Sequence, residues 1–379
     1  MDFNHTEERR MLAETIGRVV RDEYDIETRH ANAKAPTGFS PEMWGKFAEL
    51  GMIGALFDEA DGGFGGAGYD IAVVFEELGR GLVVEPFLAS AVLGGGLLSM
   101  LGNDAQKAMI EEIIAGGRLV AFAHGEPGGF YDLAEVTATA VRHGEGWELN
   151  GDKAVVINGD SADTLIVSAR IEGDRDDEDG IGLFLVDPSA SGVTVRGYGT
   201  VDGGRAAEIS LRDVHVGDDA VLGAPGGAYP AIEAVVGRAI VALCAEAVGA
   251  MEVAKDMTLE YLRTRKQFGV AIGRFQALQH RMAEVLIEIE QARSAVINAA
   301  AALTADRTTR ERALSAAKNM IGRVGRLVSE ESIQMHGGIG MTWEYALPHF
   351  AKRIVMIDHQ FGDTDHHLER FIRFNRGAA

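Results

Sequence analysis

The stretch RTRKQFGVAIGRFQALQH, residues 263–280, is the most informative segment of this 379-residue chain. Cations lead into Gln267 and Phe268, glycines follow, and a glutamine-rich helix is expected to begin near Gln276. The whole chain carries a formal net charge of −21, so a local excess of Arg and Lys indicates a bound anion. Cations at the end of a helix can also serve only solubility or the helix dipole, and this alternative stays open at the level of the segment alone.

The composition narrows the class of protein. Hydrophobic residues make up 46% and charged residues 25%, which is typical of a globular protein with room for two or three domains. The acidic balance argues against generic nucleic-acid binding. We see no apolar run near the roughly 18–20 residues of a membrane span, and no secretory signal at the start. We therefore expect a cytoplasmic protein that binds neither nucleic acid nor membrane.

The single cysteine, Cys244, lies in the apolar segment AIVALCAEAVGA. One cysteine cannot form an intramolecular disulfide, and it argues against a cysteine-based metal site. We expect Cys244 to be a small buried apolar residue rather than a reactive thiol.

Hydrophobic periodicity divides the chain into three predicted domains. Residues 1–117 have helical spacing, with Thr6 and Ser40 as expected N-caps. Residues 118–224 contain short β-branched segments separated by turn residues, and the acidic run EGDRDDEDG (172–180) is predicted to be a solvated hairpin loop. Residues 225–379 return to helix, with long antiparallel helices expected over 229–263, 276–305 and 308–336.

The glycine-rich segment GGFGGAG, residues 62–68, looks at first like a dinucleotide fingerprint. It follows a predicted helix rather than a strand, which argues against a phosphate cradle. We expect a mobile loop there.

Four segments resemble the acyl-CoA dehydrogenase family, and the resemblance extends over essentially the whole chain. They are EADGGFGGAGYDIAVVFEELGR (59–80), LNGDKAVVINGDSADTLIVSAR (149–170), YLRTRKQFGVAIGRFQALQH (261–280) and QMHGGIGMTWEY (334–345). The resemblance implies the α+β acyl-CoA dehydrogenase fold, with an N-terminal helical domain, a central β-barrel-like domain and a C-terminal four-helix bundle. More narrowly, GDSADTLIVSAR, RKQFGVAIGRFQ and FGDTDHHL resemble small subunits of heteromeric enzymes of the pimeloyl-CoA dehydrogenase type.

The resemblance also implies a chemistry. Members of the family carry out α,β-dehydrogenation of an acyl-CoA thioester, as oxidoreductases of fatty acid or steroid side-chain catabolism. A carboxylate removes an α-proton, FAD accepts hydride from the β-carbon, and the electrons leave for an electron-transferring flavoprotein. Members are usually dimers of dimers, with each FAD lying across a subunit interface.

The opening stretch then becomes part of an implied flavin site. A guanidinium can bind two pyrophosphate oxygens at once, amides can donate neutral hydrogen bonds, and glycines let the backbone approach an anion. The implied FAD-binding residues, which would reach the FAD of a neighbouring subunit, are Arg265, Gln267, Phe268, Gln276, Gln334, Gly337 and Gly338.

The predicted β domain departs from the family pattern at two places that normally contact the chain's own flavin. The usual TEP-x-x-GSD loop is replaced by HGEPGGFYD, residues 124–132. The usual Trp-Ile-Thr or Trp-Ile-Ser strand is replaced by Val155-Val156-Ile157, which has neither the indole nor the hydroxyl. The polar edge of a flavin would meet aliphatic surface there, which is costly in a dry pocket.

The catalytic base of the family is also missing from its two usual positions. The turn that normally reads Tyr-Glu-Gly-Thr corresponds to residues 359–367, where Phe361 or Gly362 stands in its place. The alternative position, on the helix before YLRTRKQFG, is Ala239. Asp363 is the nearest carboxylate and the single candidate base, although a short acidic turn residue is more often a helix cap.

Other ionisable residues have simpler interpretations. The cluster of His359, Asp363, Asp365, His366 and His367 is expected to be a solvated, charged chain end, and no metal site is predicted. Glu246, within an apolar helix, is expected to be a hydrogen-bonded carboxylate of the core or of an interface.

Three functional hypotheses follow. In the first, the chain is the small subunit of a heterotetramer, and a large acyl-CoA dehydrogenase subunit supplies the catalytic Glu and most of the thioester pocket. In the second, it is a self-sufficient homotetrameric dehydrogenase with a displaced base. In the third, it is a binding or scaffold homologue without turnover. Dicarboxylic and steroid side-chain thioesters are both compatible with the resemblance to small subunits.

Overall fold

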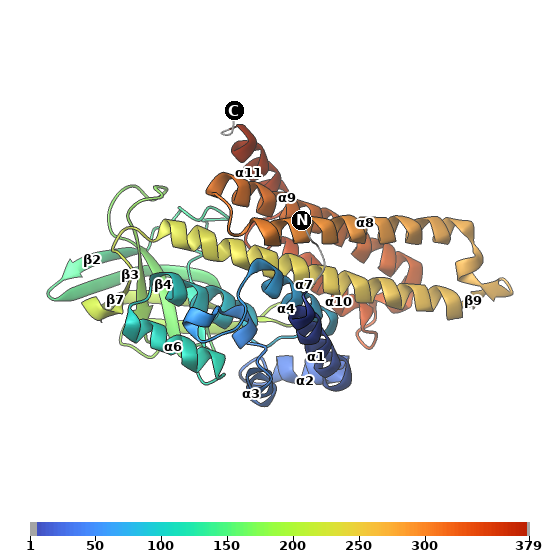
Figure 1. Cartoon of the computed structure of the whole chain (residues 1–379), viewed down its shortest axis with the longest axis horizontal. Coiled ribbons are helices and arrows are strands. Elements are labelled where there is room, and N and C mark those ends of the chain that lie inside the picture. Colours follow the sequence, from blue (N-terminus) through green and yellow to red (C-terminus); the bar gives the residue numbers. More distant parts are fainter. Residues whose placement is uncertain (1–5, 377–379) are drawn as a thin grey trace. The chain divides into compact units, whose positions relative to one another are not determined.

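The computed structural model describes residues 6–376, and Figure 1 labels its elements. The α-helices are α1 (Glu7–Glu23), α2 (Ile26–Lys34), α3 (Pro41–Glu49), α4 (Gly68–Gly81), α5 (Gly96–Leu101), α6 (Asp104–Ile114), α7 (Tyr229–Thr264), α8 (Gln276–Ala302), α9 (Arg307–His336), α10 (Leu347–Asp358) and α11 (Thr364–Arg376). The strands are β1 (Val120–Ala123), β2 (Thr139–His143), β3 (Gly146–Ile157), β4 (Thr164–Arg170), β5 (Ile181–Val186), β6 (Val193–Gly199), β7 (Arg205–Gly217), β8 (Val221–Leu222), β9 (Lys266–Gln267) and β10 (Val270–Ala271). A π-helix, Phe87–Gly95, precedes α5.

The chain forms two compact units. The first consists of the described parts of residues 1–30, 67–83 and 240–379, and the second of residues 31–66 and 84–239. Along the chain, a helical segment comes first, the strands of a mixed sheet follow, and a second helical segment comes last. This order of elements is the one that the predicted α+β class has. The two boundaries between the three domains predicted from periodicity stay a prediction.

The N-terminal helices begin where the sequence predicts. The Thr6 hydroxyl accepts a hydrogen bond from the Arg9 amide at 3.3 Å and caps α1. The Ser40 hydroxyl accepts one from the Met43 amide at 3.1 Å, and Pro41 fills the first position of α3. Each cap satisfies an amide that no helical carbonyl can reach, so both N-cap predictions are confirmed.

The second unit contains an eight-stranded sheet with the order β6-β7-β3-β2-β4-β5-β8, and β1 pairs in parallel with β4. The long antiparallel pair β3–β7 contains irregularities in register near Gly151 and Val156. Alternate residues of the strands, such as Leu149, Phe184 and Ile209, are fully buried in one core. This alternation is the period-2 pattern that predicted strands here.

The acidic run 172–180 is an exposed loop, as predicted, but a cation fixes its backbone. The guanidinium of Arg170 donates to the carbonyls of Asp177 (3.0 Å), Asp179 (2.6 Å), Arg175 (2.9 Å) and Ala134 (2.8 Å). Burial lowers the pKa of Arg170, and acidic neighbours oppose that effect. The loop is therefore solvated outside and held from within by one buried side chain.

The glycine-rich segment 62–68 contains a loop, but the close packing of its backbone differs from the expected mobile loop. The amide of Gly65 donates to Phe57 O at 2.8 Å, and that of Gly66 donates to Ala55 O at 2.9 Å. A Cβ on Gly65 would lie 2.2 Å from Ala55 O, so only glycine allows this approach. Gly65 and Gly66 therefore serve packing within the second unit.

The three long helices of the C-terminal part are confirmed as α7, α8 and α9. By length and composition alone, α7 is long and apolar enough to cross a membrane. The expectation that no apolar run approaches that length is therefore wrong. However, 89% of the most apolar stretch of α7 is buried inside the protein, as in the core helix of a globular domain. Cys244 lies in α7 with no exposed surface, as predicted, and burial raises the pKa of its thiol to about 12.

Candidate functional site

The hairpin β9–β10 lies between α7 and α8 and carries the centre of the opening stretch (Figure 1). Its turn residues Phe268 and Gly269 have φ angles of 53° and 81°, the pattern of a two-residue turn with both central residues left-handed. Such a conformation is unusual for phenylalanine, and the ring of Phe268 is 90% exposed. Gln267 is also exposed. The hairpin therefore presents an apolar ring to the outside instead of burying it.

Arg265 stands at the junction of α7 and this hairpin. Its amide donates to Tyr261 O at 2.8 Å, and its carbonyl accepts from the Ile272 amide at 2.9 Å. Its side chain is exposed and forms no hydrogen bond or ion pair with the residues of the range 6–376. The backbone is therefore fixed, while the guanidinium remains available.

Contacts between helices gather the other predicted residues at the same end of the first unit. Tyr261, near the end of α7, stacks on His336 at the end of α9, with ring centroids 4.5 Å apart. Near the start of α8, Arg281 forms an ion pair of 3.1 Å with Glu331 of α9. The first residue of α8, Gln276, and Gln334 near the end of α9 are both exposed.

Gly337 and Gly338 follow α9 and are exposed. Gly337 has φ 68° and ψ −146°, a backbone conformation that is essentially restricted to glycine. A Cβ on either glycine would meet no atom within 4 Å. Neither backbone strain nor packing explains Gly338, so the open space beside it is free for an approaching group.

The segment 124–132 of the second unit has a different character, because its charges are paired internally. Lys153 Nζ lies 2.6 Å from Glu126 Oε1 and also donates to Ser168 Oγ at 3.0 Å and to His124 O at 3.3 Å. The two charged side chains are 0% and 2% exposed. The other Glu126 oxygen accepts from the amide and the hydroxyl of Thr137. We call Glu126, Lys153 and Ser168 the buried network.

Burial is the largest single influence on the pKa of both charged side chains in the buried network. It lowers the pKa of Lys153 to about 8, and the attraction of Glu126 limits that shift. Burial also raises the pKa of Glu126, but Lys153 and the hydrogen bonds that Glu126 accepts outweigh this effect and leave the pKa below its usual value. Both side chains are therefore ionised at neutral pH. Their charges neutralise each other, so neither is available to a ligand.

Beside this network, apolar side chains face the solvent. Phe130 is 92% exposed and Val155 is 61% exposed, and both have positive φ angles, 48° and 54°. A positive φ in a β-branched residue such as Val155 is a genuine outlier. Val156 is buried, and Ile157 is half-buried. The strand segment offers no side-chain hydrogen-bond donor at the positions where the family has an indole and a hydroxyl.

The turn between α10 and α11 is where the family carries its base. Here the polar groups of this turn form hydrogen bonds with one another and with Lys318. Lys318 Nζ, fully buried, donates to Gly362 O at 2.6 Å and to Asp358 O at 2.8 Å. Asp363 accepts a hydrogen bond from the His366 amide at 2.9 Å and caps α11. Ala239, at the alternative position, has no exposed surface and no acidic group.

The expectation that residues 359–367 form a solvated, charged chain end is wrong for His367, which is buried. It is 1% exposed, and its Nε2 lies 2.9 Å from Phe361 O. Burial lowers its pKa to about 2, with further contributions from Lys318 and His366. The expectation failed because α11 packs on α9 and encloses this ring, whereas His359 and Asp365 remain exposed.

Glu246 is paired, as predicted. Its two carboxylate oxygens accept from Arg353 Nε at 2.5 Å and Nη2 at 2.6 Å, in a two-pronged arrangement within the first unit. This carboxylate is therefore committed to the core.

Comparisons with known proteins decide the family. The model of the acyl-CoA dehydrogenase N-terminal domain matches residues 6–117, that of the middle domain matches 121–214, and that of the C-terminal domain matches 227–374. The chain belongs to the acyl-CoA dehydrogenase family. The predicted family, fold class and enzyme class, an oxidoreductase acting on acyl-CoA, are thereby confirmed.

Individual members of the family resemble the chain over nearly its full length. The probable acyl-CoA dehydrogenase YngJ of Bacillus subtilis is 29% identical over 98% of this chain and 98% of its own. A structure of the Tcur3481-Tcur3483 steroid ACAD is 29% identical with a TM-score of 0.88 and covers 98% of both chains. The ChsE4-ChsE5 complex from Mycobacterium tuberculosis is 25% identical with a TM-score of 0.89 and covers 99% of both chains.

Proposed function

We propose that this acyl-CoA dehydrogenase homologue is the small subunit of an FAD-dependent enzyme, and that its bundle end completes a flavin site in a large subunit. By bundle end we mean Arg265, Gln267, Phe268, Gln276, Gln334, Gly337 and Gly338. The observation that carries the proposal is an exposed guanidinium without a partner among residues 6–376, in an acidic chain, at the end of the first unit where the open glycines follow α9.

These residues suit a pyrophosphate. The planar guanidinium of Arg265 can bind two oxygens at once, which an ammonium cannot do. The amides of Gln276 and Gln334 can donate without adding charge, and the backbone at Gly338 can come close to an anion. Phe268, held at the tip of the hairpin, can cover apolar surface of the adjoining chain. When bound, FAD would supply the acceptor for the hydride that leaves the β-carbon of the acyl-CoA.

The remaining parts of the site are assigned to the large subunit. Neither Phe361, Gly362 nor Ala239 can take the α-proton, and Asp363 caps a helix. In this account a carboxylate of the large subunit removes the proton, and this chain binds and orients the cofactor. Two of the structural relatives, the Tcur3481-Tcur3483 steroid ACAD and the ChsE4-ChsE5 complex, support a two-component enzyme, and the name of the first supports a steroid-type acyl group. An electron-transferring flavoprotein in the cytoplasm would receive the electrons.

The test is to purify the chain alone and together with a larger acyl-CoA dehydrogenase homologue of the same organism that carries the family's catalytic Glu. Flavin absorbance and ferricenium-coupled turnover are then measured with dicarboxylic and steroid acyl-CoA thioesters. We expect turnover only in the combined preparation, abolished when the large subunit's base is changed to Gln. Turnover by the chain alone would instead identify a self-sufficient homotetramer. A complex that binds acyl-CoA without turnover would identify a scaffold.

A further inference from the structure

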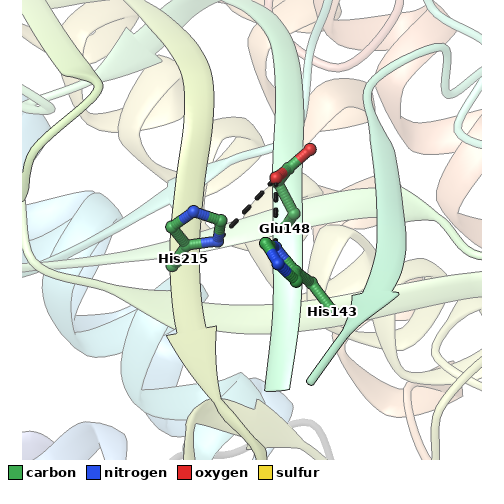
Figure 2. A group of neighbouring side chains, drawn as sticks. All are labelled: His143, Glu148 and His215. Atoms are coloured by element: carbon green, nitrogen blue, oxygen red, sulfur yellow. Dashed lines mark ion pairs between the residues drawn. The ribbon is translucent and has the colours of Figure 1, made fainter. Parts of the chain in front are cut away.

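Three potential metal ligands meet on the outer face of the sheet, apart from every residue discussed above. They are His143 at the end of β2, Glu148 on β3 and His215 on β7, and Figure 2 shows their side chains converging. Their ligand atoms all lie within 4.8 Å of one another. Within the described range 6–376, this is the one such group of three.

The register of the strands creates this cluster. Glu148 lies directly opposite His215 in the antiparallel pair β3–β7, and His143 lies opposite Gly146, two residues before Glu148. Directly opposed and diagonal neighbours on one face of a sheet are close enough for their side chains to meet. Gly146 is required for a separate reason, because a Cβ there would lie 2.3 Å from Val216 O. It also leaves no side chain between the His143 ring and Glu148.

The distances fit a metal ion. Glu148 Oε2 lies 3.3 Å from His143 Nδ1 and 3.9 Å from His215 Nδ1. Ligands about 2.0–2.1 Å from a tetrahedral zinc ion are roughly 3.3 Å from each other. One of the three pairs already has that spacing, and the other two, at 3.9 Å and at most 4.8 Å, reach it if the exposed imidazoles rotate. Both imidazoles are about three-fifths exposed, at 60% and 59%, so neither ring is locked by packing.

A neighbouring amide holds the carboxylate in place. Asn150 Nδ2 donates to Glu148 Oε1 at 3.3 Å, while Oε2 faces the two imidazoles. Hydrogen bonds of this kind to the second oxygen orient ligating carboxylates in metal sites. The two rings stand at 69° with centroids 4.7 Å apart, and the Nδ1 atom of each is the ring nitrogen paired with Glu148 Oε2.

We propose that His143, Glu148 and His215 bind a divalent transition-metal ion of the zinc class, with Asn150 as a positioning residue. Two imidazoles and one carboxylate favour Zn²⁺, Ni²⁺ or Cu²⁺ over Mg²⁺ and Ca²⁺, which prefer oxygen ligands. Three protein ligands leave a fourth position for water or for a side chain from another molecule. The site concerns metal binding and does not depend on the dehydrogenation proposed above.

The test uses the full chain without a polyhistidine tag, treated with EDTA and then dialysed free of it. Zn²⁺ is added in competition with a chromogenic zinc indicator, and Co²⁺ is added separately to record its ligand-field absorption. We expect one equivalent of Zn²⁺ per chain, with a tenfold excess of Mg²⁺ giving no displacement. H143A and H215A should each abolish binding or weaken it by more than tenfold, and N150A should weaken it roughly tenfold.

The matched control is H280A, which removes an exposed histidine from helix α8 outside the cluster. It should leave the stoichiometry and the affinity unchanged. Because all four positions lie on the surface or at its edge, circular dichroism should show folded variants. Zinc binding that survives the H143A/H215A double change, or that Mg²⁺ displaces equally well, would overturn the proposal. A loss equally large in H280A would do the same.

Discussion

The buried network and the bundle end differ in whether their positive charge is paired: the cation of the first is buried with partners, and the cation of the second is exposed. Lys153 has no exposed surface, and its ammonium group donates hydrogen bonds to Glu126, Ser168 and the His124 carbonyl. Arg265 is exposed, and its guanidinium finds no partner among the residues described, although its backbone is fixed. A cation that the fold has neutralised contributes to structure, whereas a cation left free in a chain of net charge −21 is available to an anion from outside.

The largest expected effect comes from breaking the buried network. Lys153→Met leaves the Glu126 carboxylate buried without its cation, which should cost about 3–5 kcal/mol in the free energy of unfolding. The measurement is urea denaturation followed by circular dichroism. The Lys153→Met/Glu126→Gln double variant should recover most of the loss, because neither charge remains. A single variant as stable as the native chain would show that the network is not ionised.

The turn after α10 resembles the buried network, because the ionisable side chains that bond to its carbonyls, His367 and Lys318, are also buried. His367 has a folded-state pKa of about 2, below its usual value of 6.5. As the pH falls below 6.5, the unfolded chain takes up a proton that the folded chain refuses. Stability conferred by the neutral ring is therefore complete above pH 6.5 and is lost below it, by about 1.4 kcal/mol per pH unit. His367→Gln should flatten the dependence of unfolding free energy on pH between 6 and 4. An unchanged slope would mean that His367 is accessible to protons.

The smallest expected effect concerns the one candidate base. Asparagine caps helices as well as aspartate does, so Asp363→Asn should change stability by only a few tenths of a kcal/mol. Asp363→Ala should cost about 0.5–2 kcal/mol, because the His366 amide loses its acceptor. Turnover of the proposed two-component enzyme should stay nearly intact in both variants. A loss of orders of magnitude with unchanged FAD content would make this chain catalytic.

Local signals predicted the parts of the fold that depend on neighbours in sequence. Thr6 and Ser40 cap helices because the hydroxyl and the amide it receives are three residues apart. The long helices follow from their apolar spacing, and the family motifs gave the fold class. The exposure of Arg265 and Gln276 agrees with the role that the resemblance implies, and that role remains a proposal.

The rest depends on contacts that sequence spacing does not reveal. Lys153 on β3 contacts Glu126 because this strand packs against the loop 124–132. Glu148 contacts His215 because β7 pairs with β3, although other strands separate them along the chain. His367 looked solvated among charged residues, but its burial is decided by the packing of α11 on α9. In each case tertiary structure, rather than local pattern, brings the residues together.

The most direct test of the central claim is flavin retention by the combined preparation carrying Arg265→Ala. FAD content is measured after gel filtration, with Arg323→Ala as a control that removes an exposed cation from α9. A charge-assisted bond to pyrophosphate is worth about 1.5–3 kcal/mol, so Arg265→Ala should weaken FAD binding by about tenfold or more. Arg265→Lys should restore only part of it, and Arg323→Ala should retain it fully. If Arg265→Ala holds FAD as tightly as the native chain, the bundle end is only a helix terminus, and the account is contradicted.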